Sequence, residues 1–147
     1  MKFFRNMYQK SKEQKGFTLV EMIVVLVIIA ILAAITIPAL LKYIDKAKDK
    51  QLVINARTAY LAAETAASEA YAAGYTVPST NTITFGKTPA NDVGGFVANA
   101  QSLTGLTATS YTCKVTFNTD WKITKVEYTE TKKATLDISA GKDWKVE

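Results

Sequence analysis

Histidine is absent from this sequence of 147 residues, and cysteine occurs once, at Cys113. The missing histidine removes the commonest general base and the commonest zinc ligand. A single cysteine cannot form an intrachain disulfide, so the fold must hold without that covalent link. Cys113 alternates in phase with Tyr111 and Val115, which favours a core position over a reactive thiol. No nucleophile–base arrangement, phosphate loop or metal-ligand spacing is present, so we expect no enzyme, cofactor or metal site.

Net charge is also small outside the N-terminus. The net charge is +5, and residues 1–16 carry five basic residues against one acidic residue. The remaining residues therefore sum to only +1. Because the excess lies in a short tail, a general nucleic-acid-binding surface is not implied, and no specific nucleic-acid partner is expected.

A long apolar run follows this tail. Phe17 to Leu41 is 25 residues long, enough to cross a bilayer as a helix, and it contains one charged residue, Glu21. A charge there is costly, so its presence needs a reason. By the positive-inside rule the basic flank would stay cytoplasmic and the rest would face outward. A cleaved secretory signal and a plain membrane anchor are the alternative interpretations.

Helical periodicity continues beyond the apolar run. Small apolar residues recur at spacings of three and four, which predicts one helix face able to approach another layer closely: these are Leu52, Ala56, Ala59, Ala63, Ala66 and Ala70. Gly74 and the proline that follows at position 78 predict the end of the helix. We therefore predict one helix from Phe17 to Ala73, with a kink or local break at Pro38.

The remainder of the chain predicts an antiparallel sheet. Residues 83–85 suggest a short strand, and residues 93–103 a short helix that ends at Gly105. Residues 111–117 alternate with period two, residues 118–120 suggest a hairpin loop, and a change of phase near Thr124 and Lys125 predicts a bulge. A third run follows at 134–138, and the tail around Trp144 and Val146 suggests an edge contact. The predicted class is α+β, with the sheet packed on the alanine-rich helix face.

The stretch Lys15-Gly16-Phe17-Thr18-Leu19-Val20-Glu21, with its basic leader, apolar run and Pro38, resembles the N-terminus of type IV pilins and the related pseudopilins. The resemblance covers residues 15–38. The order of a long helix and then an antiparallel sheet agrees with that family but is less specific. The lack of a disulfide is more typical of pilins of Gram-positive anaerobes than of those of Gram-negative pathogens.

The resemblance implies how the N-terminus is processed. A membrane-embedded prepilin peptidase would cut between Gly16 and Phe17 and would N-methylate the new amino terminus on Phe17. The chain would then divide into three parts: a cleaved basic leader at 1–16, a transmembrane and filament-core segment at 17–41, and a globular head at 42–147.

The resemblance also gives Glu21 a role. The family uses this glutamate to pair with the terminal ammonium group of a neighbouring subunit, and that pair would set the register between subunits. The alternative is a carboxylate that snorkels to the interface and interacts with the helix dipole. Thr18 would assist by contacting the terminus or by capping the helix, or it is a simple helix-start residue. Pro38 resembles the position at which the helix loosens in the fibre, with a plain interface kink as the alternative.

The implied function is a structural subunit of a surface filament for adhesion, motility or aggregation. The alternative is a pseudopilin of a type II-like secretion or DNA-uptake system. The implied partners are other copies of the chain, membrane lipid before assembly, the prepilin peptidase, and the inner-membrane assembly platform with its ATPase. The implied location is the cytoplasmic membrane as a single-pass precursor and then the cell-surface pilus. The lysines between Lys42 and Lys50 are interpreted as a solvated helix face that forms salt bridges between subunits, with DNA or lipid contact as the alternative.

Overall fold

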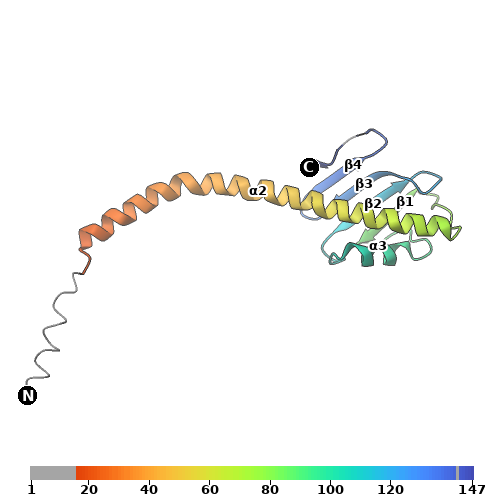
Figure 1. Ribbon diagram of the computed structural model, residues 1–147, viewed down its shortest axis with the longest axis horizontal. Helices are drawn as coiled ribbons and strands as arrows, with labels where there is room; N and C mark the ends of the chain where they lie inside the picture. The colour runs from red at the N-terminus through yellow and green to blue at the C-terminus, as the bar shows by residue number, and fades with distance from the viewer. Residues whose placement is uncertain (1–15, 142) are drawn as a thin grey trace, which may run out of the picture. The chain divides into compact units, whose positions relative to one another are not determined.

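The computed structural model describes residues 16–141 and 143–147. Its first element is the long helix α2 (Leu19–Ala72), which is followed by the strand β1 (Thr82–Gly86) and the helix α3 (Phe96–Thr104). Four strands complete the chain: β2 (Thr112–Phe117), β3 (Ile123–Thr129), β4 (Lys133–Asp137) and β5 (Lys145–Val146) (Figure 1). This α+β order agrees with the predicted fold class.

The chain divides into two compact units between Ile44 and Asp45, and α2 contributes to both. In the first unit, the described residues are the three that precede α2 and the N-terminal part of α2, and all are exposed apart from the half-buried Ala33. The second unit, residues 45–147, contains the rest of α2, α3 and all five strands. From here on, the head means these residues.

The sheet of the head is antiparallel throughout, with the strand order β1-β2-β3-β4-β5. The predicted bulge is present. Thr116 pairs with Lys125 whereas Phe117 pairs with Ile123, so Thr124 is an extra residue on β3. The period-two runs predicted three of the strands, and the short runs at 83–85 and at the C-terminal tail become the two edge strands, β1 and β5.

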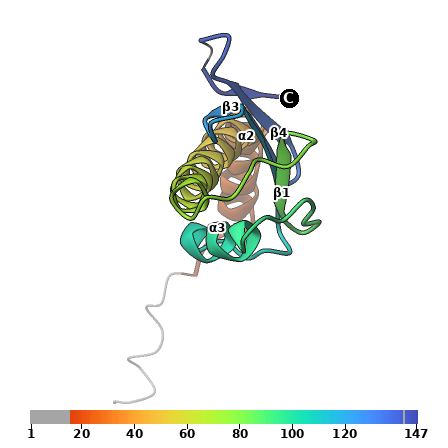
Figure 2. The ribbon, with the colours of Figure 1, turned by 90° about the vertical axis from the view of Figure 1, so that its right-hand side faces the viewer.

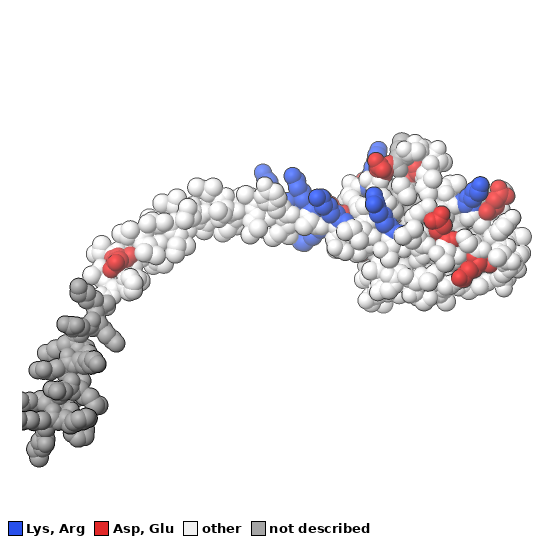
Figure 3. Space-filling view, in the orientation of Figure 1, with Lys and Arg blue, Asp and Glu red and all other residues white. Residues whose placement is uncertain are grey.

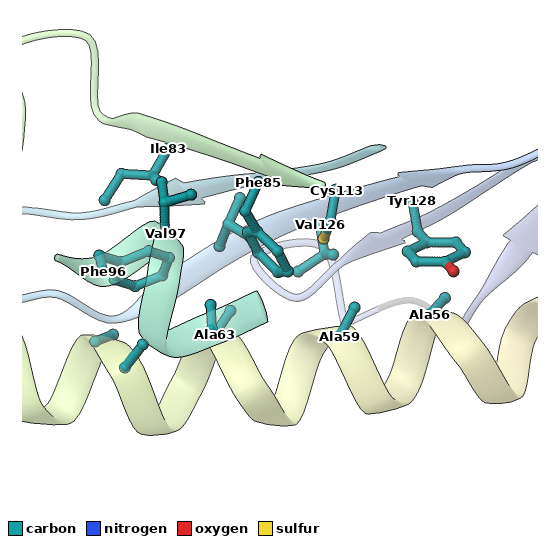
Figure 4. Packing of buried hydrophobic residues seen from close by; sticks show 14 of the residues in the cluster. Ala56, Ala59, Ala63, Ile83, Phe85, Phe96, Val97, Cys113, Val126 and Tyr128 are labelled. Atoms are coloured by element: carbon teal, nitrogen blue, oxygen red, sulfur yellow. The ribbon is translucent and has the colours of Figure 1, made fainter. Parts of the chain in front are cut away.

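The core lies between this sheet and the alanine-rich face of α2. All six residues predicted for that face are buried, together with Ala62 and Ala67. Figure 4 shows Ala56, Ala59 and Ala63 beneath side chains of the sheet. Because alanine side chains are short, the helix backbone can approach the sheet closely and larger sheet residues fill the space. Figure 2 shows that α3 lies on the same side of the sheet as α2.

Large side chains supply most of the volume of this core. Phe96 of α3 lies edge-to-face with Phe85 and with Phe117, with ring centroids 6.3 and 5.6 Å apart. Tyr111 stacks on Tyr128 at 5.3 Å. Such aromatic pairs add to the free energy gained by burying their area. Cys113 is fully buried among them, as its alternation predicts.

Glycines set two local boundaries in the head. The predicted helix at 93–103 begins later, at Phe96, because Gly94 and Gly95 adopt left-handed backbone angles with φ of 60° and 77°. Its end at Gly105 is confirmed. Gly86 has a φ of 101°, and a Cβ there would lie 2.3 Å from the carbonyl oxygen of Tyr111, so only glycine allows this close approach.

Polar contacts tie the turn between β3 and β4 to α2. Asn55 donates a hydrogen bond to Glu130 at 2.9 Å, and Tyr128 donates one to the same carboxylate at 2.5 Å. Lys132 pairs with Asp49 at 2.6 Å. The turn is therefore attached to the helix at two places, just before the first buried residue of α2, Leu52, and just after it.

Candidate processing and assembly site

The N-terminal part of α2 presents apolar side chains on every side. Phe17, Leu19 and Ile35 are 74%, 75% and 70% exposed, and the stretch has no partner layer within the described unit. This helix is long enough and apolar enough to cross a membrane, judged by length and composition. An apolar surface of this extent marks a membrane or protein contact.

Thr18 caps the start of this helix. Its hydroxyl oxygen accepts a hydrogen bond from the backbone N–H of Glu21 at 3.2 Å, and its carbonyl accepts the first helical bond, from Met22. A threonine followed three residues later by glutamate is the capping-box pattern, in which the cap satisfies an otherwise free helical N–H. The capping role predicted as one possibility for Thr18 is therefore present.

Glu21 lies in the first turn of α2 and is exposed. A negative charge there interacts favourably with the helix dipole. Phe17 lies two residues before the first helical residue, so the helix begins later than predicted because Thr18 takes the cap position. In the uncut chain the nitrogen of Phe17 is a peptide amide rather than an ammonium group. The pairing proposed for Glu21 therefore requires cleavage after Gly16.

Gly16 is exposed, and a Cβ added there would meet no other atom within 4 Å. Within the described chain, nothing about packing requires glycine at this position. A requirement for glycine would come from the peptidase, which is the reason the resemblance gives.

Pro38 lies inside α2, and the helix continues through it without an interruption. The local break is therefore not present in this structure, and loosening in a fibre stays a prediction. Proline lacks an N–H, so the carbonyl of Ala34 loses its helical donor. Nearby, the hydroxyl of Thr36 donates to the carbonyl of Leu32 at 2.9 Å. Such bonds from threonine to the preceding turn favour bending of a helix.

Comparison with known proteins gives two partial matches. Residues 11–37 match the family described as the prokaryotic N-terminal methylation motif. Over 40 residues the chain is 52% identical to fimbrial protein Q of Moraxella bovis, an alignment that covers 27% of this chain and 26% of that protein. The chain thus matches about a quarter of the length of this relative. No solved structure matches it.

The first match shows that residues 11–37 carry an N-terminal methylation motif. The chain is also similar over 40 residues to a fimbrial protein, and each of the two matches covers less than a third of the chain. The long apolar helix followed by a small antiparallel sheet is consistent with the pilin fold. Neither match distinguishes bacterial types, so the Gram-positive type stays a prediction.

The motif located the N-terminal residues from the sequence, but a cavity in the head was not predicted. It lies beside Tyr60 of α2 and the loop between β2 and β3. The sequence predicted that loop as a hairpin connection. This loop contacts a helix residue about 60 positions earlier in the chain. Such a contact depends on tertiary packing, and no local sequence pattern predicts it.

Proposed function

We propose that this chain is a structural subunit of a type IV pilus and that it assembles into a surface filament. The observation that carries the proposal is the methylation motif on a capped apolar helix with a single carboxylate in its first turn. In this proposal a prepilin peptidase cuts between Gly16 and Phe17 and methylates the new terminus. We expect no catalytic activity from the chain itself.

Cleavage changes the electrostatics of the helix start. The new terminal ammonium would lie next to Thr18, at the edge of the apolar span. In an assembled filament, the ammonium of one copy would pair with Glu21 of another. Each of these charges would otherwise stay unpaired in a medium of low dielectric, and the pairing offsets that cost. The pair would contribute mainly to the specificity of assembly, because one polar contact in an apolar surface fixes the register between copies.

The exposed apolar helix surface would have two environments in turn. As a single-pass precursor in the cytoplasmic membrane, it would contact lipid, with residues 42–147 outside. In the filament, the same side chains would pack against other copies. Contacts between different surfaces of identical chains do not close and therefore generate open helical polymers. Transfer from membrane to filament would require an assembly platform with its ATPase.

The test is mass spectrometry of the N-terminus on protein sheared from intact cells. We expect an abundant chain that starts at N-methylated Phe17. A chain with an intact leader would contradict the cleavage assignment. The matched variant is Gly16→Phe, which we expect to accumulate as uncut precursor because a bulky side chain replaces the smallest one at the cut.

The same measurement separates the pilus from a secretion or DNA-uptake pseudopilin. A processed chain that is abundant in the sheared fraction supports the pilus subunit. A processed chain that stays in the membrane fraction, with no filaments in electron micrographs, would retain the peptidase step but replace the pilus with the pseudopilin.

A further inference from the structure

A cavity of about 450 Å³ opens on the head between α2 and the loop that joins β2 to β3. Its walls include three aromatic residues: Tyr60 and Tyr71 of α2, and Trp121 of the loop. Two carboxylates, Glu64 and Asp120, also line it, together with Lys122. Within the residues that the structure describes, neither carboxylate forms an ion pair. Aromatic faces beside carboxylates form an environment that suits a cation.

The loop that forms one wall of this cavity is held in an unusual conformation. Trp121 has a φ of 59°, a left-handed angle that bulky residues rarely adopt. Its indole N–H donates to the carbonyl of Tyr75 at 2.8 Å, and its ring stacks on Phe96 with centroids 6.1 Å apart. Asn118 accepts hydrogen bonds from the N–H groups of Asp120 and Lys122. The wall is therefore fixed by packing and hydrogen bonds.

Tyr60 and Glu64 form the helix side of the cavity. Burial raises the pKa of Tyr60, and the carboxylate of Glu64 raises it further. The phenol is therefore neutral at physiological pH and close to the carboxylate of Glu64. The lining charge of Glu64, Asp120 and Lys122 together is −1.

Earlier on α2, the charge has the opposite sign. Residues 42–50, which we call the basic stretch, contain four lysines and two aspartates. Asp49 pairs with Lys132, and Asp45 also contributes to the raised pKa of that lysine. The lysines themselves are exposed, and in the described part of the chain none has an ion-pair partner: they are Lys42, Lys46, Lys48 and Lys50. Figure 3 shows a group of basic side chains midway along the long helix, whereas the head carries side chains of both signs.

We propose that the cavity beside Tyr60 receives a lysine of the basic stretch of a second copy of this chain. The inference rests on the proposed filament, in which copies lie in one direction. The carboxylates of Glu64 and Asp120 would pair with the lysine, and the aromatic rings would contact its methylene stem. The net charges of the two surfaces are opposite in sign, −1 for the cavity lining and +2 for the basic stretch, which is why a second copy is favoured as the occupant.

The distance along α2 shows that this contact must join two copies and cannot form within one chain. Lys50 and Glu64 are 14 residues apart, which is about 21 Å of helix. The lysine of one chain cannot reach its own cavity. A second copy shifted along the helix by about this distance, and rotated by the screw operation of a filament, would bring its lysines to the cavity. The Glu21 pair spans four residues, or about 6 Å, so the two contacts would join different neighbours.

Zero-length carbodiimide coupling on sheared wild-type filaments tests the proposal. This reagent joins a carboxylate and an amine only where they already touch. Mass spectrometry should then find Glu64 or Asp120 linked to a lysine of the basic stretch. The link between Asp49 and Lys132, which lie 2.6 Å apart within one chain, is the positive control for the reaction. Filaments that contain this control link but none to the cavity would overturn the inference and leave the proposed function intact.

A variant pair provides the second measurement. In Glu64→Gln with Asp120→Asn, both charges are removed at constant size, and we expect the yield of sheared filaments to fall about threefold to tenfold, as for the loss of partly exposed ion pairs. Asp143→Asn removes an exposed carboxylate outside the cavity and should leave the yield unchanged. Equal yields from both variants would overturn the inference. If the wild type itself forms no filament, the proposed function fails, and the inference fails with it.

Discussion

Glu21 is the only charged side chain between Phe17 and Leu41, so its replacement alters the electrostatics of the whole apolar span. In Glu21→Gln the side chain keeps its size and loses its charge. We expect normal membrane insertion and normal cleavage, because neither needs the carboxylate. Filament yield after shearing should fall at least tenfold, because the ammonium of the neighbouring copy stays unpaired in an apolar surface.

Immunoblotting of the sheared and membrane fractions, with the processed and unprocessed forms resolved on the gel, measures both effects. Thr18→Ser is the matched control, because serine retains the hydroxyl that accepts the hydrogen bond from the N–H of Glu21. Filaments of Glu21→Gln at the wild-type level would remove the register role from this residue and leave only its interaction with the helix dipole.

Two buried groups are expected to lower the free energy of unfolding of the head as the pH rises through the alkaline range. Burial raises the pKa of the Cys113 thiol, and burial together with the hydrogen bond to Glu130 raises the pKa of the Tyr128 phenol. Above pH of about 8.5 the unfolded thiol loses its proton while the folded one retains it, and the phenol follows above about 10. The unfolded state then binds fewer protons, so the free energy of unfolding must fall as pH rises.

For Cys113 alone, the loss should approach 1.4 kcal/mol for each pH unit above the unfolded thiol pKa. Urea unfolding of the detergent-solubilised chain at pH 7.5 and pH 9.5 measures it. In Cys113→Ala the thiol contribution should vanish and leave a flatter pH dependence over this range. An unchanged slope in the alanine variant would show that Cys113 ionises equally in both states.

At the scale of the element, the second half of α2 packs closely on the sheet because its buried side chains are short. Ala63 is fully buried against the sheet, whereas Leu61, on the other side of the helix, is 59% exposed. Ala63→Leu inserts three carbons where the helix and the sheet already touch. It should lower the free energy of unfolding by about 1–3 kcal/mol. Leu61→Ala should change it by no more than about 0.5 kcal/mol. Thermal unfolding monitored by circular dichroism compares the two, and a neutral Ala63→Leu would mean that the layer is loosely packed.

The same contrast explains which elements the sequence could predict. The periodicity of the alanines is a local property, so the buried face of α2 was predicted residue by residue. The alternation around Cys113 predicted β2, and the change of phase predicted the bulge at Thr124. The edge strand β5 was suggested only as a contact of the tail, because two residues carry no period. The start of α3 was misplaced because two left-handed glycines exclude residues that otherwise continue the helical spacing.

For the candidate site, prediction depended on the kind of signal. Gly16, Phe17 and Glu21 occur in a contiguous motif, so the sequence alone located them. The cavity beside Tyr60 joins residues of α2 to a loop about 60 positions later and to a tryptophan with a left-handed backbone. No local pattern encodes such an arrangement, since it depends on how the sheet packs on the helix.

At the scale of the whole molecule, the two units differ in what stabilises them. The first buried residue of α2 is Leu52, and none of the described residues before it contributes a buried side chain. The head therefore contains its entire described hydrophobic core. The apolar half of α2 has no buried side chain within its described unit, and an exposed apolar surface of this extent suits contact with lipid or with protein.

Residues 45–147 produced alone should therefore fold and stay soluble. We expect a monomer in sedimentation velocity and a single cooperative transition on heating, because every buried contact of the head is retained. The full chain is the comparison, and it should require detergent and should associate when the detergent is removed, since its apolar helix surface is uncovered. The contacts of the turn between β3 and β4 with Asp49 and Asn55 lie close to the new terminus, so they test whether the start of the truncated helix stays folded. If the truncated chain melted without cooperativity, α2 would need its apolar half to stay helical, and the two units would not be independent in stability.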